Sequence, residues 1–142
     1  MVQSWPSKAQ VSDPRGRRVN AADVVRTYAS AWMETDESAR RRALQAAWAD
    51  DGAYCDPTAL VLGREALVKH IGGFHAQMPA HRLVVTSGVD EHHGFLRFTW
   101  AIQNSDGTLV LEGVDFGELA DDGRLRRIVG FFGPPPAGST GQ

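Results

Sequence analysis

The hydrophobic residues recur with a helical period in the first half of the chain and alternate as in β-strands in the second half. A first helix follows Asn20, whose side chain can cap it, and a third helix follows Gly63 and ends before Pro79. Between them, a second helix runs from residue 35 or 36 to about residue 49, with Arg40–Arg42 on its solvent-exposed face. The inward face of the first helix carries Val24, Val25, Tyr28, Ala31 and Trp32.

Five strands are predicted in the remainder, and two of the turns between them contain Asp-Gly pairs, which favour hairpins. The first strand is short, because Pro57 ends it directly after Asp56. Three helices and a mainly antiparallel series of strands predict an α+β fold, in which the helices pack on one face of a strongly curved sheet. Such a sheet forms a cone with an internal pocket. The strands are expected at residues 53–56, 83–89, 95–103, 108–120 and 124–132.

The two ends of the chain differ from this central part. Residues 1–19 are polar and interrupted by prolines and a glycine, so we predict a flexible N-terminal arm. Residues 134–142 begin with three prolines, which cannot continue a strand, and we predict a loose C-terminal tail. A single folded domain is therefore expected at residues 20–133.

The composition excludes several classes of protein. A formal charge of −2 without a basic stripe argues against nucleic acid or an anionic membrane surface as a partner. The one cysteine, Cys55, cannot form an internal disulfide, and no apolar stretch approaches the ~20 residues of a membrane span. These features predict a cytoplasmic protein of one domain that acts on or binds a small molecule.

Sequence motifs give no support for a cofactor or a metal. The glycine-rich motifs of nucleotide and dinucleotide sites are absent, and so is the GxSxG motif of serine hydrolases. His70 and His75 are five residues apart on a helix, whereas two ligands on one helix face are three or four residues apart. We therefore expect no metal and no cofactor.

Four polar residues lie at positions where the pattern predicts the interior or the end of a strand. Tyr28 and His75 lie on inward helix faces, and Asp56 shares a strand face with Tyr54. Asp115 lies inside the longest strand, where a buried carboxyl group needs a partner or a proton. Each also has a structural interpretation: a core tyrosine, a core histidine, a turn former and an aspartate on the outer face of the sheet.

Several stretches of the sequence occur together in one superfamily: VVRTY at 24–28, WADDGAYCDP at 48–57, GREA at 63–66, GVDF at 113–116 and DGRL at 122–125. On these stretches the chain resembles the nuclear transport factor 2-like superfamily, in its SnoaL-like and ketosteroid isomerase branch. The resemblance extends over about residues 20–133. It implies the cone-shaped α+β fold, and it is not specific to one activity.

The resemblance also implies roles for three residues. In ketosteroid isomerases the aspartate of the Asp-Pro pair moves a proton, and this residue matches Asp56. A tyrosine on the first helix and a protonated aspartic acid on the long strand donate hydrogen bonds to the developing oxyanion. They match Tyr28, after a short insertion in the second helix, and Asp115, which is eight residues before Gly123. The implied activity is a proton shift next to a carbonyl group of a steroid-like or polyketide-like substrate.

We therefore expect Asp56, Tyr28 and Asp115 as catalytic residues in an apolar pocket that takes a small hydrophobic molecule. A second copy of the chain is expected to cover the outer face of the sheet, around Val129 and Phe131, and to form a homodimer. The residues expected to bind the substrate are Trp32, Trp48, Phe74, His75, Phe98, Trp100 and Phe132.

Two alternatives remain open at this point. The chain could be a non-catalytic binding module for small hydrophobic ligands, with Asp56 as a turn residue and Asp115 paired to Arg97 or His81. It could also be a relative of polyketide cyclases or dehydratases. A cyclase of this sequence would have to use Asp56 or Asp115 as its base, because the last strand contains no acidic residue.

Overall fold

The computed structural model describes residues 20–139, so the predicted arm at residues 1–19 and the last three residues of the predicted tail lie outside it. The described part contains α1 (Ala21–Met33), α2 (Glu37–Ala47), β1 (Trp48–Asp56), β2 (Ala59–Leu62), α3 (Arg64–Gln77), β3 (Arg82–Val85), β4 (Asp90–His92), β5 (Phe95–Gln103), β6 (Leu109–Leu119) and β7 (Leu125–Phe132).

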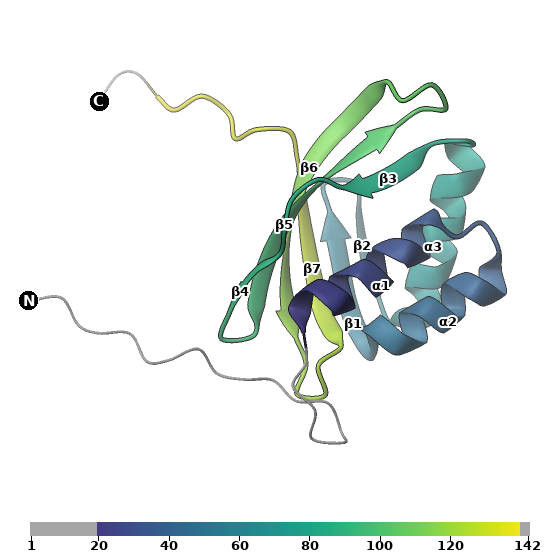
Figure 1. The fold of residues 1–142 in the computed structure, drawn as a ribbon, viewed down its shortest axis with the longest axis vertical. Coiled ribbons are helices and arrows are strands. Elements are labelled where there is room, and N and C mark those ends of the chain that lie inside the picture. Colours follow the sequence, from purple (N-terminus) through teal and green to yellow (C-terminus); the bar gives the residue numbers. More distant parts are fainter. Residues whose placement is uncertain (1–19, 140–142) are drawn as a thin grey trace, which may run out of the picture.

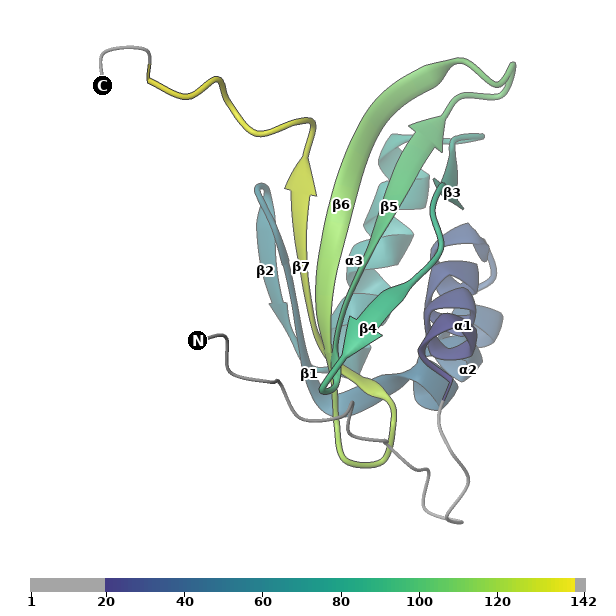
Figure 2. The ribbon, with the colours of Figure 1, turned by 60° about the vertical axis from the view of Figure 1, so that its left-hand side comes forward.

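The strands form one sheet in the order β2-β1-β7-β6-β5-β3, and β4 pairs with β5. β1 and β7 are parallel, and the other pairs are antiparallel. The three helices lie together on one side of the open, curved sheet (Figure 1), and Figure 2 shows how strongly β6 bends. The predicted α+β fold, with three helices on a curved and mainly antiparallel sheet, is confirmed.

Two strands were not predicted from the sequence. β2 pairs with β1 through a tight turn at Pro57 and Thr58, and β4 forms from residues expected in a turn. The turn itself is at His93 and Gly94, both of which have positive φ angles, 54° and 82°. Both strands are short, and their sequences do not alternate between polar and hydrophobic residues. The hydrophobic pattern of the sequence therefore does not reveal them.

Two of the helices, α1 and α2, begin where a side chain can satisfy their free backbone N–H groups. Oδ1 of Asn20 accepts a hydrogen bond from the N–H of Ala22 at 2.9 Å, and Asp36 accepts one from Ala39 at 2.8 Å. The core between helices and sheet contains these fully buried side chains: Val25, Tyr28, Leu44, Trp48, Leu67, Val68, Ile71, Leu125 and Ile128.

Arg40 was predicted on the solvent-exposed face of α2, and this prediction is wrong. Only 3% of the residue is exposed, and its guanidinium donates hydrogen bonds of 3.1–3.2 Å to the carbonyl oxygens of Glu34, Thr35 and Val68. Glu34 and Thr35 lie at the C-terminal end of α1, where the last carbonyls have no partner within the helix and carry partial negative charge, which favours a cation there. The third acceptor, Val68, lies inside α3. Arg40 therefore joins the turn between α1 and α2 to α3.

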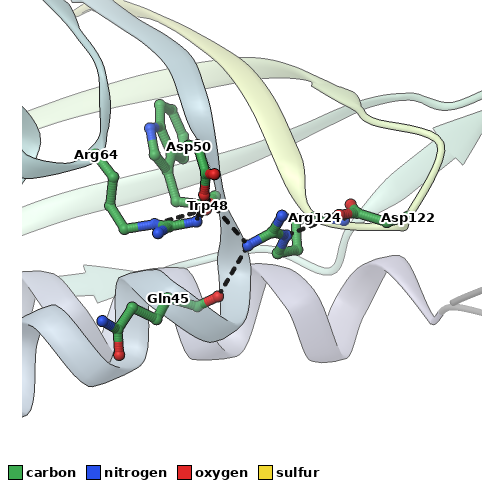
Figure 3. A network of polar contacts seen from close by, with 6 residues as sticks. All are labelled: Gln45, Trp48, Asp50, Arg64, Asp122 and Arg124. Carbon is green, nitrogen blue, oxygen red and sulfur yellow. Dashed lines mark hydrogen bonds and ion pairs between the residues drawn. The ribbon is translucent and has the colours of Figure 1, made fainter. Parts of the chain in front are cut away.

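A second network holds the start of β1 (Figure 3). Arg64 donates two hydrogen bonds to the carbonyl oxygen of Trp48, at 3.0 and 2.8 Å, and pairs with Asp50. On the other side of Asp50, Arg124 forms an ion pair with Asp122 at 2.9 Å. Its Nη1 atom also donates a hydrogen bond to the carbonyl oxygen of Gln45 in the last turn of α2, at 3.3 Å. These residues belong to the stretches that carry the superfamily resemblance, and here they fix the joint between α2, β1 and the turn before β7.

Candidate active site

A cavity of about 380 Å³ lies between α1, α3 and the concave face of the sheet. All three predicted catalytic residues line it: Tyr28 from the middle of α1, Asp56 from the end of β1 and Asp115 from β6. Five of the residues predicted to bind the substrate line it as well, namely Trp32, Phe74, Phe98, Trp100 and Phe132. The structure thus brings together groups that are far apart in the sequence.

Glycines on the concave face make room for the polar groups. Asp115 is opposite Gly130 in the β6–β7 register, and a Cβ atom at Gly130 would lie 2.8 Å from Oδ1 of Asp115 and 3.6 Å from Cβ of Asp56. A Cβ atom at Gly113 would likewise overlap the ring of Trp100. Because Gly130 has no side chain, the carboxyl groups of two strands that are not neighbours can approach each other over β7.

Asp115 is 7% exposed, and its Oδ1 atom accepts a hydrogen bond from the indole N–H of Trp100 at 2.9 Å. Burial raises the pKa of Asp115 to about 7, against the effect of the Trp100 hydrogen bond, and the negative charge of Asp56 adds to the rise. Near neutral pH a large share of the molecules therefore carries a proton on Asp115. With Oδ1 accepting from Trp100, this proton can be donated from Oδ2.

Asp56 has the opposite character. Partial burial acts to raise its pKa, but hydrogen bonds from Tyr54 and Thr58, together with His70, outweigh burial and hold the pKa below its usual value. Oδ2 accepts from the Tyr54 hydroxyl at 2.6 Å, and Oδ1 accepts from both the N–H and the hydroxyl of Thr58 at 2.7 Å. Since an ionised carboxylate has about four acceptor positions, one remains for a substrate proton.

The hydroxyl group of Tyr28 is a donor without a partner. The residue is 2% exposed, and its hydroxyl makes no hydrogen bond to any residue in the described part of the chain. Burial, together with the charges of Asp115 and Asp56, raises the pKa of Tyr28 against the opposing effect of the Trp32 side chain, so the hydroxyl keeps its proton. A buried donor without an acceptor costs free energy, and this cost is recovered when a ligand oxygen reaches it.

Comparison with known proteins places this chain in a family. The family model described as a SnoaL-like domain matches residues 24–128, which is most of the chain. The chain belongs to the SnoaL-like family. The sequence resemblance to the SnoaL-like branch of the nuclear transport factor 2-like superfamily is thereby confirmed. A comparison with curated proteins found no match.

Solved structures agree with this assignment. A SnoaL-like family protein from Agrobacterium tumefaciens str. C58, provisionally named an isomerase, is 32% identical, with a TM-score of 0.75 over 79% of this chain and 96% of that chain. A protein of unknown function with a cystatin-like fold from Methylobium petroleophilum PM1 is 15% identical, with a TM-score of 0.68 over 94% of this chain and 86% of that chain. A SnoaL-like protein from Jannaschia sp. CCS1, provisionally named a polyketide cyclase, is 15% identical, with a TM-score of 0.60 over 77% of this chain and 84% of that chain. The last two show the fold alone.

Two residues predicted to line the pocket of this SnoaL-like protein do not. Trp48 is fully buried and lies behind Tyr28, with the two rings stacked at a centroid distance of 5.5 Å. His75 is next to the lining residue Phe74 but is not part of the lining itself. Successive residues of a helix point about 100° apart, so the helix face that presents Phe74 to the cavity directs His75 elsewhere.

The pairing expected for a non-catalytic Asp115 is also wrong. Arg97 pairs with Asp90 at 2.9 Å, and His81 contacts the carbonyl oxygen of Pro79 at 3.0 Å. The partner of Asp115 is instead Trp100, whose indole carries no charge. Neither Arg97 nor His81 therefore pairs with Asp115.

Sequence reasoning did not assign four polar residues of the pocket to the site: Tyr54, Thr58, His70 and Gln77. The ring of His70 lies 5.5 Å from that of Tyr54 and 6.0 Å from that of Trp32. A signal was present, because His70 is four residues before Phe74 and thus shares its helix face, and Tyr54 is two residues before Asp56 on one strand.

Residues 20–139 contain neither a candidate metal site nor a membrane-spanning helix. No group of three or more His, Cys, Asp or Glu side chains is arranged to hold a metal ion. No helix in this part of the SnoaL-like protein is both long enough and apolar enough to cross a membrane.

Proposed function

We propose that this SnoaL-like protein catalyses a cofactor-independent proton shift next to a carbonyl group of a hydrophobic substrate, which is an isomerase-type reaction. One observation carries the proposal: a carboxylate with a lowered pKa, a carboxyl group with a raised pKa and an unpartnered tyrosine hydroxyl line the same cavity. Two acids with separated pKa values are what a site needs to hold a base and a proton donor together. The name of the relative from Agrobacterium tumefaciens agrees with this class of reaction.

The proposed reaction begins when the Asp56 carboxylate takes a proton from the carbon next to the carbonyl group. The electron pair of that C–H bond forms a carbon–carbon double bond, and the carbonyl oxygen becomes an oxyanion. Tyr28 and the protonated Asp115 donate hydrogen bonds to this oxygen, where the negative charge develops. Asp56 then returns the proton to another carbon of the conjugated system, and the carbonyl group re-forms.

The lining of the cavity supports a flat hydrophobic substrate. Trp32, Phe74, Phe98, Trp100 and Phe132 surround the polar groups with aromatic surface, and about 380 Å³ is within the usual range of small-molecule pockets. We therefore propose steroid-like or polyketide-like ketones as the class of substrate. In such a pocket the bound ketone excludes water, which strengthens the hydrogen bonds to its oxygen.

A test without a known substrate is the exchange of α-hydrogens in D₂O, followed by NMR for a panel of cyclic hydrophobic ketones. Asp56→Asn should slow the catalysed exchange at least ~100-fold, because the amide cannot accept the proton. Asp51→Asn is the matched control, since Asp51 is an exposed residue of the same strand. An unchanged rate in Asp56→Asn would remove Asp56 as the base.

A non-catalytic role remains the second candidate, because one observation favours it. Both hydrogen bonds from Thr58 to Oδ1 of Asp56 belong to the turn between β1 and β2, so Asp56 also has a structural function. If ketones bind in the cavity of the native protein without any α-hydrogen exchange, the site is a binding module. A polyketide cyclase would have to use Asp56 or Asp115 as its base, and would show exchange together with ring closure.

We also propose that the protein is a homodimer formed through the outer face of the sheet. Phe95, Phe116 and Phe131 are 52%, 43% and 53% exposed on this face, next to Glu118 and Arg127. A face that carries both signs of charge can meet a second copy of itself with opposite charges paired. Analytical ultracentrifugation should show a dimer for the native chain and a monomer for Phe131→Glu, and a native monomer would refute the proposal.

A further inference from the structure

The two carboxyl groups beside Gly130 receive different numbers of hydrogen bonds. Asp56 accepts three, from the Tyr54 hydroxyl and from the N–H and hydroxyl of Thr58, over distances of 2.6–2.7 Å. Asp115 accepts one, from Trp100 at 2.9 Å. Because donors stabilise the ionised form of a carboxyl group, this asymmetry favours the negative charge on Asp56.

Tyr54 is held in place by its surroundings. It is 6% exposed, and its ring packs against that of Trp32 at 5.6 Å and that of His70 at 5.5 Å. Its backbone is fixed between two strands, opposite Val61 of β2 and Ile128 of β7. The direction of its hydroxyl is therefore set by packing rather than by the hydrogen bond to Asp56 alone.

We propose that Tyr54 is a positioning residue that, together with Thr58, places the negative charge of the carboxyl pair on Asp56 and leaves the proton to Asp115. The inference deepens the proposed function and rests on it, because it explains which acid is the base and which is the donor. Two neighbouring carboxyl groups ionise one after the other, so a few hydrogen bonds decide which of them ionises first. The lowered pKa of Asp56 and the raised pKa of Asp115 agree with this order.

Other groups that face Asp56 could have the same effect and must be separated from Tyr54. They are His70 from α3, Tyr28 from α1 and Asp115 from β6. A protonated His70 favours the ionised form of Asp56 through its charge, whereas Tyr54 acts through a hydrogen bond. Comparing Tyr54→Phe with His70→Gln therefore distinguishes the two causes.

The test is a ¹³C NMR titration of the side-chain carboxyl carbons of Asp56 and Asp115 in the full-length chain. In Tyr54→Phe, which keeps the ring, the pKa of Asp56 should rise by about one and that of Asp115 should fall. Thr58→Val should raise the pKa of Asp56 less, because Thr58 is exposed and water can replace its hydroxyl, whereas Tyr54 is buried. Trp100→Phe is the matched control on the other acid, and it should raise the pKa of Asp115. An unchanged Asp56 pKa in Tyr54→Phe would overturn the inference.

Activity gives a second readout that a structural role of Tyr54 would not produce. In Tyr54→Phe the acid limb of the pH profile of kcat/KM should move upward with the pKa of Asp56, while the rate on the plateau is largely kept. An equal loss at every pH would show that Tyr54 only supports the fold. If Asp56→Asn retained full exchange activity, the proposed function would fail, and the titration would still decide the charge assignment.

Discussion

The contact between Arg40 and α3 and the pocket around Tyr28 both bury polar side chains. They differ in whether the buried donors have hydrogen-bond partners. Arg40 is 3% exposed and donates to three backbone carbonyl groups. Tyr28 is 2% exposed, and no residue of the described chain accepts from its hydroxyl. Burial alone therefore does not distinguish a structural polar residue from a functional one.

The difference lies in what each group does for folding. A buried donor with all its partners stabilises the fold, whereas a buried donor without one lowers the free energy of unfolding. Asp115 resembles Tyr28 in this respect, because it has one hydrogen-bond donor and a pKa raised to about 7 by burial. We infer that the pocket keeps binding capacity at the expense of stability, and the following variants test this contrast.

The largest effect on stability is expected from the replacement of Arg40. Arg40→Met keeps the length of the side chain but leaves the carbonyl groups of Glu34 and Thr35 without the guanidinium donor and removes the hydrogen bond to Val68 of α3. The free energy of unfolding should fall by about 4 kcal/mol, and Arg40→Lys should recover part of it, because an ammonium group cannot span all three oxygens. Urea denaturation measures both variants. A loss below about 1 kcal/mol for Arg40→Met would show that the carbonyl groups need no partner.

A smaller gain is expected at Asp115. An unfolded Asp ionises near pH 3.9, whereas burial raises the pKa of the folded Asp115 to about 7. Between these values the folded state binds one more proton at Asp115, so the contribution of Asp115 to stability is largest at low pH and falls as the pH rises toward 7. Asp115→Asn cannot titrate, and at pH 8 its free energy of unfolding should exceed that of the native chain by about 3 kcal/mol.

Activity should show the same titration. In the native chain, α-hydrogen exchange should decline above about pH 7, where Asp115 loses the proton that it donates. The amide of Asp115→Asn keeps a donor at every pH, so its exchange rate should show no such decline. A stability difference independent of pH between the two proteins would mean that Asp115 is ionised throughout.

Tyr28→Phe should separate stability from activity. Removal of a buried hydroxyl without a partner should leave the free energy of unfolding unchanged or raise it by about 1 kcal/mol. The exchange rate should nevertheless fall about 100-fold, since one of the two oxyanion donors is lost. Thermal unfolding and the exchange assay on the same sample test both parts. A marked loss of stability would show that the hydroxyl does have a partner.

The smallest effect compares two adjacent glycines of α3. A Cβ atom at Gly72 would lie 2.9 Å from Nη1 of Arg40, whereas nothing lies within 4 Å of one at Gly73. Alanine is favoured over glycine in a helix interior, so Gly73→Ala should raise the free energy of unfolding by up to about 1 kcal/mol. The gain is measured as a rise in the melting temperature. Gly72→Ala should lose this gain, because the guanidinium held by three carbonyls cannot move freely. Equal gains would mean that Arg40 is loosely held.

The sequence predicted the parts of the site that interrupt a regular hydrophobic pattern. Tyr28 lies on the inward face of a clear amphipathic helix, and Asp56 directly precedes Pro57, which ends a strand. Both positions follow from local periodicity and from the chemistry of proline, which act within a few residues. The three helices and most strands were predictable for the same reason.

Other features depend on contacts between distant residues. The face of Asp115 was ambiguous, because Gly113 and Gly117 replace hydrophobic residues on the inner face of β6, while Phe116 is exposed on the outer face. Arg40 looks like its exposed neighbour Arg42 in sequence, and its burial depends on the carbonyl group of Val68 in α3 and on those of the turn after α1. Neither the space over a glycine nor a tertiary hydrogen bond leaves a periodic signal in the chain.

The most direct measurement is a crystal structure of the protein with an α,β-unsaturated cyclic ketone bound in the cavity. The account predicts that the ketone oxygen lies within hydrogen-bond distance of both the Tyr28 hydroxyl and the carboxyl group of Asp115. It also predicts that a carbon of the conjugated system faces the carboxylate of Asp56. A ketone oxygen that contacts neither the Tyr28 hydroxyl nor the carboxyl group of Asp115 would contradict the proposed chemistry.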